Sequence, residues 1–448
     1  MPRALLVAYY MPPAGGPAVQ RILQFVEYLR DEGWALEVLT VRDGAYPNRD
    51  PALCEVVPEA VRVHRTRALD PYAAYQALTG KTEADLPTGS MAPEAPSWKE
   101  DLARWVRANV FLPDARVGWV PFAVWRGRQL LTSGRFDALI TSGAPHSVHL
   151  TGTALRQWTG TPWVADLHDP WTDISYYDDL PHTRWARRLD AALERSVLRR
   201  ADAVTTVSPS WADLFASKAE NEYVVIENGF DAADCGRVEA VPPDDAFVLA
   251  HVGKLYASRN PTALWRALAT LRQSDAIPQL RLRFVGTVDP EVQRSLQEHN
   301  LMPIVETVDF VPHEEALREM ARSTLLLLVI ESFAQADGMI TSKLYEYLAS
   351  GRPVLGVGPA SGDANALLRR HAAGEVVAWK NGRRLREVVQ THYEAWARGA
   401  PKAGAPLDAL TRHTRQHQAH RMARVLASIT DGPAPPLAEA SSAPPPSD

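Results

Sequence analysis

Apolar and polar positions follow two alternating patterns along the chain. Short apolar runs rich in Val, Leu and Phe recur throughout, and between most of them apolar residues return every three or four positions. The first pattern is typical of buried strands and the second of helices that bury one face. The apolar runs predict thirteen strands, at residues 4–10, 35–41, 61–66, 136–142, 163–167, 203–208, 223–229, 247–253, 281–286, 305–311, 324–330, 353–358 and 374–379.

The alternation of strands and helices predicts parallel sheets in an α/β fold. Thirteen strands exceed what one doubly wound sheet comfortably holds, so we expect two lobes. The polar segment at 231–246, which contains two prolines, is the best boundary between them. The sequence therefore predicts an N-terminal lobe at 1–240, a C-terminal lobe at 241–405, an insertion loop at 67–97 and a disordered Pro/Ala/Ser tail at 431–448.

Composition narrows the class of protein. Apolar residues make up 46% and charged residues 23% of the 448 positions, as in an ordinary soluble globular protein. The net charge of −5 argues against a nucleic-acid partner, and two cysteines make neither a disulfide framework nor a zinc pattern. No apolar run reaches about 18 residues, and Pro12 and Pro13 interrupt the short apolar N-terminus. We expect a cytoplasmic protein, soluble or peripheral at the inner membrane surface.

The segment GMITSKLYEYLASGRPVLGVGP, which begins at Gly338, reads as loop, helix, turn and strand directly after the strand at 324–330. Ligands in open α/β sheets bind beyond the carboxyl ends of strands, and a helix N-terminus there offers free N–H groups to a phosphate. Gly338 permits close approach of the backbone. Thr341 and Ser342 can cap the helix or bind phosphate, Lys343 can neutralise it, and Glu346 can accept hydrogen bonds from sugar or ribose hydroxyls. The alternative is an ordinary capped helix with a Lys343–Glu346 ion pair.

A second loop with suitable chemistry follows the strand at 247–253. It begins at Gly253 and carries Lys254 and Arg259. Two cations at the carboxyl end of a strand suit a diphosphate, with arginine giving bidentate contact and lysine a point charge. A solvated loop without a ligand is the alternative.

Two further segments lie in the predicted first lobe. Gly15 and Gly16 follow the first strand and precede an amphipathic helix, which suits the approach of a phosphate or sugar but is equally typical of a plain βα turn. The segment WVADLHDPWTD places His168 at a strand end within a cluster of aspartates. Its spacing matches no standard metal motif, and Asp169 followed by proline also predicts a helix N-cap.

Other residues carry weaker indications. His146 and His149, in SGAPHSVHL, are more often structural than catalytic at such positions. Residues 97–131 are rich in Trp and Arg, which suits contact with a membrane or a lipid-linked acceptor. A core helix pair whose arginines extend to solvent is the alternative.

Taken together and in order, these motifs resemble the GT-B glycosyltransferases of glycosyltransferase family 4. The resemblance covers about residues 3–380 and rests on AYYMPPAGGPAVQR, PDARVGW, TSGAPHSVHLTG, WVADLHDPW, ADAVTTVS, VIENGFD, HVGKLYASRNP, RFVG, VDFVPH and KLYEYLASGRPVL. It implies two Rossmann-like lobes that face each other across a cleft. The first lobe would bind the acceptor, the second a nucleotide sugar, and a C-terminal helix within 406–430 would cross back to the first lobe.

The resemblance also implies roles for individual residues. His168 would lie near the donor sugar as a catalytic residue, with Lys254 and Arg259 on the diphosphate. Glu346 would hold the ribose. The remaining positions would lie on the donor side, namely Gly16, Gly253, Val311, Gly338, Met339, Ile340, Thr341, Ser342 and Lys343, or on the acceptor side, namely Gly15, His146 and Asp169.

One position departs from the family pattern. The first glutamate of the family's E-x7-E motif, which contacts the donor sugar, is replaced by Gly338. Asp337, Glu331 or the backbone of residues 338–340 would have to take its place. The departure leaves the identity of the donor open.

The resemblance implies a retaining, metal-independent transfer of a sugar from a nucleotide diphosphate sugar to a hydroxyl acceptor, with no cofactor. A UDP-sugar is the default donor, and the acceptor is a sugar, a lipid-linked intermediate or a small molecule. The alternatives are a nucleotide-sugar 2-epimerase of the same two-lobed fold and a non-catalytic nucleotide-sugar-binding scaffold. No G-x-G-x-x-G follows the first strand, which argues against a Rossmann dehydrogenase. The sequence indicates no oligomeric state.

Overall fold

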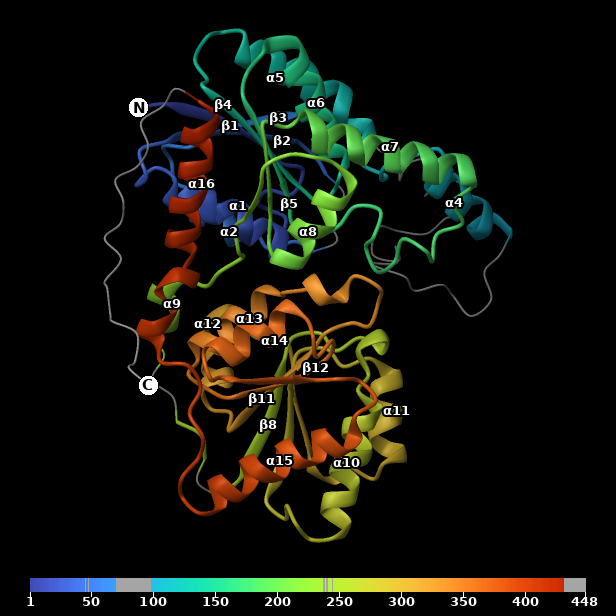
Figure 1. Ribbon diagram of the computed structural model, residues 1–448, viewed down its shortest axis with the longest axis vertical. Coiled ribbons are helices and arrows are strands. Elements are labelled where there is room, and N and C mark those ends of the chain that lie inside the picture. The colour runs from blue at the N-terminus through green and yellow to red at the C-terminus, as the bar shows by residue number, and fades with distance from the viewer. Residues whose placement is uncertain are drawn as a thin grey trace.

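The computed structural model describes residues 1–44, 46, 48–69, 98–236, 238, 241–243 and 245–430. The predicted tail at 431–448 and most of the predicted insertion loop lie outside these residues. Two parallel sheets form the centres of two lobes, which are stacked along the long axis of the molecule (Figure 1). No helix among the described residues has the length and apolarity needed to cross a bilayer.

The first lobe contains a seven-stranded sheet in the order β3-β2-β1-β4-β5-β6-β7, with every neighbouring pair parallel. Its strands are β1 (Arg3–Val7), β2 (Ala35–Val41), β3 (Arg62–Thr66), β4 (Ala138–Gly143), β5 (Trp163–Leu167), β6 (Ala203–Thr206) and β7 (Tyr223–Val225). Its helices are α1 (Pro17–Tyr28), α2 (Leu53–Val56), α4 (Trp98–Asn109), η2 (Val117–Trp119), α5 (Val120–Leu131), α6 (Ser147–Thr159), α7 (Arg184–Arg200) and α8 (Pro209–Lys218). The short helix α9 (Ala232–Gly236) follows between the lobes and packs on α13 (Ser342–Ala349) of the second lobe.

The second lobe contains a six-stranded sheet in the order β10-β9-β8-β11-β12-β13, again parallel throughout. Its strands are β8 (Phe247–Val252), β9 (Leu280–Val285), β10 (Val305–Val308), β11 (Leu325–Val329), β12 (Val354–Val357) and β13 (Gly374–Val377). Its helices are η3 (Ala257–Arg259), α10 (Thr262–Gln273), α11 (Pro290–Glu298), η4 (Met302–Ile304), α12 (His313–Ala321), η5 (Ala336–Gly338), α13 (Ser342–Ala349), α14 (Asp363–Arg370) and α15 (Gly382–Ala397). The chain ends with η6 (Leu407–His413) and α16 (Arg415–Ile429).

All thirteen predicted strands are confirmed, and most are a few residues shorter than their apolar runs. The runs extend beyond the strands because apolar residues continue into the loops that pack against the sheet. The predicted division into lobes falls between β7 and β8. The apolar face of α1 and its C-cap residue Leu29 are also buried, since Val19, Ile22, Leu23, Val26 and Leu29 are each at most 3% exposed.

The chain passes between the lobes twice, and the two passages lie against each other. Phe230 pairs with Thr414 in a parallel bridge, and Phe230 N–H donates to the His413 carbonyl. Beyond this point α16 runs beside α1 of the first lobe, as Figure 1 shows. Met422 and Leu426 of α16 are fully buried in the hydrophobic core of the first lobe.

A buried ion pair lies at the centre of the first lobe. Arg21 of α1 binds both carboxylate oxygens of Asp166 on β5, at 2.6 and 3.0 Å, and both residues are at most 2% exposed. Ser142 of β4 and Thr205 of β6 each donate to the same carboxylate at 2.7 Å. Arg21 also donates to the Glu227 carbonyl beyond β7. The pair therefore joins one helix to four successive strands or strand ends.

We predict that Arg21→Met will destabilise the protein strongly. The substitution leaves the Asp166 charge buried without its partner, which typically lowers the free energy of unfolding by about 3–5 kcal/mol. Urea denaturation monitored by circular dichroism measures this change. The matched control is Arg3→Met, since Arg3 is exposed and its Glu37 oxygen lies 3.9 Å away. We expect the control to change stability by about 0–1 kcal/mol. Equal effects of the two substitutions would contradict the prediction.

Candidate functional site

Lys343, in the first turn of α13, extends its side chain over the end of β8. A Cβ atom built on Gly253 would lie 2.6 Å from Lys343 Nζ, and Gly253 has a φ of +120°, so only glycine fits there. Among the described residues, no carboxylate lies within ion-pair distance of Lys343, and the alternative Lys343–Glu346 pair is not formed. Burial lowers the pKa of Lys343; the Glu346 carboxylate opposes this shift, and the Arg259 charge adds to it. Lys343 is therefore a half-buried cation that forms no ion pair with the other described residues.

The start of α13 adds uncapped backbone donors. Thr341 has the extended backbone of an N-cap residue, yet its side chain caps nothing, and its hydroxyl is buried without a partner. The half-buried Ser342 begins the helix. Of the two roles considered for Thr341, the structure does not show the side-chain cap, and the first N–H groups of α13 remain available to another acceptor.

Arg259 reaches the same region from η3. Its guanidinium lies 3.9 Å from a carboxylate oxygen of Glu331, at the end of β11, and over the Tyr256 ring. Arg259 Nε is buried without a hydrogen-bond partner. The Lys254 side chain is exposed and forms no ion pair among the described residues. Thus the structure brings Arg259 and Lys343 together, with Lys254 at the rim.

Gly338 is buried against the first lobe. A Cβ at this position would lie 2.2 Å from Cδ1 of Trp211 on α8, so the indole ring fills the space that a side chain would need. Trp211 Nε1 donates to the Gln335 carbonyl at 3.1 Å, and Ser210 N–H donates to Asp363 across the lobes at 2.9 Å. Met339 packs against the hydrophobic cores of both lobes. The glycine therefore serves contact between the lobes, a role that sequence reasoning missed.

His168 lies at the end of β5, in a chain of hydrogen bonds. Its Nε2 is 2.9 Å from Ser142 Oγ, and Ser142 Oγ donates to Asp166 at 2.7 Å. Because the hydroxyl has one proton, Nε2 must be the donor to it, which fixes the neutral tautomer. Burial, together with the nearby Arg21 charge, lowers the pKa of His168 to about 4, although Asp166 opposes the shift. Neutral His168 can therefore accept a hydrogen bond at Nδ1.

His146 and His149 are both buried near this site. The His146 ring stacks on Trp171 at 5.1 Å, and neither of its nitrogens has a hydrogen-bond partner. His149 Nδ1 lies 2.9 Å from Thr141 Oγ1. Desolvation lowers the pKa of His149 to about 3 and that of His146 well below its usual value. Both histidines are therefore neutral and well packed.

Asp169 does not cap a helix, so that expectation is wrong. Residues 168–183 form bends and turns, and the next helix begins at Arg184 with Thr183 as its cap. Trp171 holds this segment by donating to Asp190 at 2.7 Å, which prevents a helical start after Pro170. Asp169 stays half-buried, and desolvation raises its pKa to about 6.

Sequence reasoning missed the role of Asp114, which accepts from Ser147 N–H and Oγ at 2.8 Å and so holds the start of α6. The motif PDARVGW contained this residue without revealing its partner.

The remaining predicted residues surround these groups. Gly16 precedes α1 with a φ of +106°, and Gly15 packs on Asp50. Glu346 is half-buried and forms no side-chain hydrogen bond among the described residues. Val311 and the buried Ile340 belong to the second-lobe packing. No group of three or more His, Cys, Asp or Glu residues among the described residues could hold a metal ion.

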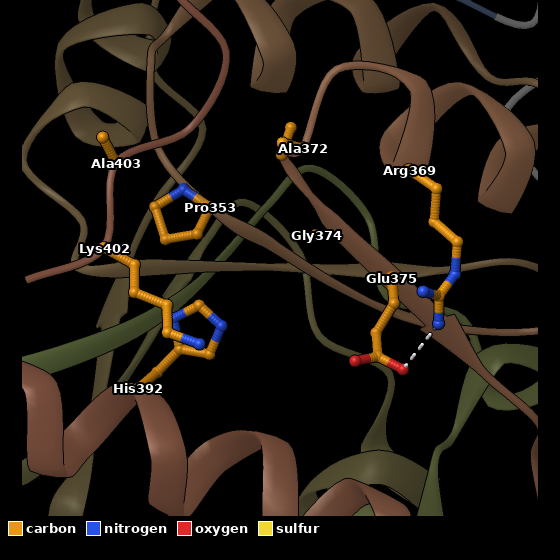
Figure 2. Close-up of a pocket in the computed structure, with 9 residues that line it drawn as sticks. Pro353, Arg369, Ala372, Gly374, Glu375, His392, Lys402 and Ala403 are labelled. Carbon is orange, nitrogen blue, oxygen red and sulfur yellow. Dashed lines mark hydrogen bonds and ion pairs between the residues drawn. The ribbon is translucent and has the colours of Figure 1, made fainter. Parts of the chain in front are cut away.

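A separate hollow of about 230 Å³ lies at the opposite ends of β12 and β13. Figure 2 shows Lys402 beside His392, and Glu375 bound to Arg369. None of the predicted site residues lines it.

Helix α4 does not fit the alternative of a core helix pair for residues 97–131. Trp98, Leu102 and Trp105 are 45–72% exposed on α4, whereas α5 buries Ala123 and Leu131. The expected pair of core helices is thus correct only for α5. Asn109 ties the end of α4 to the loop before α7 through Pro181 and Thr183.

Comparison with known proteins gives one family domain and several related folds. Residues 15–229 match the family described as Glycosyl transferase 4-like domain. Sucrose-phosphate synthase from Thermosynechococcus elongatus is 18% identical, with 96% of this chain and 99% of that chain covered and a TM-score of 0.64. A structure titled "Trehalose-6-phosphate from E. coli bound with UDP-2-fluoro glucose" is 10% identical, with 95% and 98% covered and a TM-score of 0.57.

The third similar structure is a putative UDP-N-acetylglucosamine 2-epimerase from Listeria monocytogenes, 11% identical, with 97% and 99% covered and a TM-score of 0.52. No curated protein sequence matches this chain. At these identities the similarity shows the fold, and the predicted GT-B architecture of two Rossmann-like lobes is confirmed.

We predict that Gly338→Ala will destabilise the protein, because the new methyl group must displace the Trp211 ring. Overpacking of this kind typically lowers the free energy of unfolding by about 1–3 kcal/mol. Gly382→Ala is the control, since the nearest atom to its added Cβ is 3.6 Å away. In a Trp211→Ala background the Gly338→Ala penalty should disappear, which a double-mutant cycle measures. A penalty that persists without Trp211 would disprove the contact.

His168 should make stability depend on pH. Its folded pKa of about 4 lies below the usual value of about 6.5, so the unfolded chain binds the extra proton between these pH values. The contribution of His168 to the free energy of unfolding is fully present above pH about 6.5. It decreases as the pH falls toward the folded pKa, by at most about 1.4 kcal/mol per pH unit. His168→Gln should flatten this slope in denaturation curves between pH 7 and 4.5, whereas His313→Gln, at an exposed position, should not. Parallel curves for wild type and His168→Gln would refute the assignment.

Proposed function

Because residues 15–229 form a glycosyl transferase 4-like domain and the chain adopts the GT-B fold, we propose that the protein is a glycosyltransferase. It transfers a sugar from a nucleotide diphosphate sugar to a hydroxyl acceptor. The observation that carries the proposal is the unpaired Lys343 beside Gly253, close to Arg259 and to the start of α13.

These groups suit a diphosphate. Lys343 and Arg259 supply two positive charges, and the free N–H groups at the start of α13 supply donors at the positive end of a helix dipole. Burial is the main cause that lowers the pKa of Lys343 and the Arg259 charge adds to it, against the opposing charge of Glu346, so a bound dianion would favour the charged lysine. Glu346, half-buried and unpaired one turn along α13, is placed to accept hydrogen bonds from ribose hydroxyls.

The same groups account for the chemical step that we propose. When the bond from sugar to diphosphate breaks, negative charge develops on the leaving phosphate, where Lys343, Arg259 and the helix start stabilise it. The acceptor hydroxyl attacks from the face that the leaving group vacates and gives its proton to a phosphate oxygen, so the anomeric configuration is retained. Neutral His168 orients the sugar or the acceptor by accepting a hydrogen bond at Nδ1.

On the acceptor side we propose the group formed by the buried His146 and His168 and the half-buried Asp169. Helix α4, which carries exposed tryptophans, contacts the segment 168–183 through the bond from Arg104 to the Asp179 carbonyl. Such residues suit the interface of a membrane, which supports a lipid-linked acceptor and a peripheral location.

The first experiment is a thermal shift measurement with UDP, GDP, ADP, CDP and dTDP in turn. A ligand at about 100 times its dissociation constant stabilises a protein by roughly 2.7 kcal/mol, which raises the melting temperature by a few degrees. A shift with one nucleotide, with UDP the expected one, supports the donor lobe and identifies the base. No shift with any of the five would overturn the proposal. A product that contains an acceptor distinguishes transfer from 2-epimerisation.

We predict that Lys343→Ala will weaken binding of that nucleotide and reduce kcat by about 10²-fold, as the loss of one stabilising donor typically does. Lys380→Ala removes an exposed lysine outside the site and should leave both unchanged. Isothermal calorimetry and initial-rate kinetics measure the two effects. Wild-type nucleotide affinity in Lys343→Ala would show that this lysine does not bind phosphate.

A further inference from the structure

The position of the missing motif glutamate has no room for a glutamate side chain unless Trp211 moves. Trp211 of the first lobe occupies the space next to Gly338, where even a methyl group would lie 2.2 Å from the indole ring. A carboxylate that serves the donor sugar must therefore come from another position. Two acidic residues, Asp337 and Glu331, lie in the same loop between β11 and α13.

Asp337 is turned away from the site. Its side chain is exposed, and Ser361 Oγ, in the loop before α14, lies 3.3 and 3.4 Å from its two carboxylate oxygens. Its backbone packs against Gly362, which holds the residue in this orientation. The aspartate thus belongs to the outer edge of the loop.

Glu331 occupies the opposite end of the loop and is only 21% exposed. It follows β11, whose end is held by the bond from Trp379 Nε1 to the Ile330 carbonyl at 3.1 Å. One carboxylate oxygen lies 3.9 Å from the Arg259 guanidinium and 3.5 Å from Ser175 Oγ of the first lobe. Both contacts are long, so they leave the carboxylate free to accept stronger hydrogen bonds.

We propose that Glu331 is the residue that recognises the donor sugar, by accepting hydrogen bonds from its ring hydroxyls. This inference rests on the proposed function. A sugar attached to a diphosphate held by Arg259 and Lys343 lies next to those cations, and Glu331 is the carboxylate beside Arg259. Ser175 brings the acceptor-side segment 168–183 to the same carboxylate, so the sugar would lie between donor and acceptor groups.

A second role for Glu331 must be distinguished from this one. The carboxylate could act only through Arg259, by holding the guanidinium in place for the phosphate. In that case removal of Glu331 changes binding of the free nucleotide and of the nucleotide sugar alike. Direct recognition of the sugar changes binding of the nucleotide sugar alone.

The test compares Glu331→Ala and Glu331→Gln with Asp337→Asn, which removes the other carboxylate of the loop. The ligands are UDP, UDP-glucose, UDP-galactose and UDP-N-acetylglucosamine. If another nucleoside diphosphate raises the melting temperature of the wild-type protein, the same sugars are tested on that nucleotide. Isothermal calorimetry measures each dissociation constant. Activity is not needed.

We expect Glu331→Ala to bind the preferred nucleotide sugar about tenfold more weakly than wild type, with affinity for the free nucleotide changed less than about twofold. The affinity of Glu331→Gln for the nucleotide sugar should lie between those of Glu331→Ala and wild type, and the affinity of Asp337→Asn should equal that of wild type. Equal losses for nucleotide and nucleotide sugar, or no loss for any adduct, would overturn the inference while leaving the proposed function intact. A wild type that binds no nucleotide would overturn the proposed function itself, and the inference with it.

Discussion

The buried pairing of Arg21 with Asp166 is the interaction on which the first lobe depends. Neither charge could remain in that dry interior alone, because an isolated buried ion is far too unfavourable. Each therefore requires the other, and the pair requires α1, β4, β5 and β6 in register. His168 is the outermost member of this network, so the orientation of a candidate catalytic ring follows from a structural ion pair several ångströms deeper.

One cation of the second lobe is arranged differently. Among the described residues Lys343 forms no ion pair, and it lies beside a glycine that allows its approach and a helix start without a side-chain cap. Separately, each feature lowers stability slightly, since an unpaired charge and an unbonded hydroxyl both lose solvation. Together they form a site in which a bound anion would pair with the lysine charge and accept hydrogen bonds from the free donors. The buried charge of the first lobe thus serves stability, whereas the cation of the second lobe is available to bind an anion.

The sequence predicted the strands well because each is a short apolar run with clear polar borders, as at 247–253 and 324–330. It also predicted the cationic character of the loop after β8, since residue type alone decides that. It did not predict that Trp211 fills the space at Gly338, nor that the Lys343 side chain lies over Gly253. These contacts join residues far apart in the chain, and local pattern carries no information about them. The helix predicted after Asp169 failed for the same reason, because Asp190 holds Trp171 elsewhere.

The crossing at Phe230 and Thr414 determines when, during synthesis, the core of the first lobe can be completed. The core of the first lobe is completed by α16, whose residues leave the ribosome only after the entire second lobe has been synthesised. Until then the surface of α1 that α16 covers stays open to water, over a stretch of translation of about ten seconds or more at usual elongation rates. The nascent chain therefore carries an uncovered apolar surface through most of its synthesis, and this surface is buried only when the last helix docks.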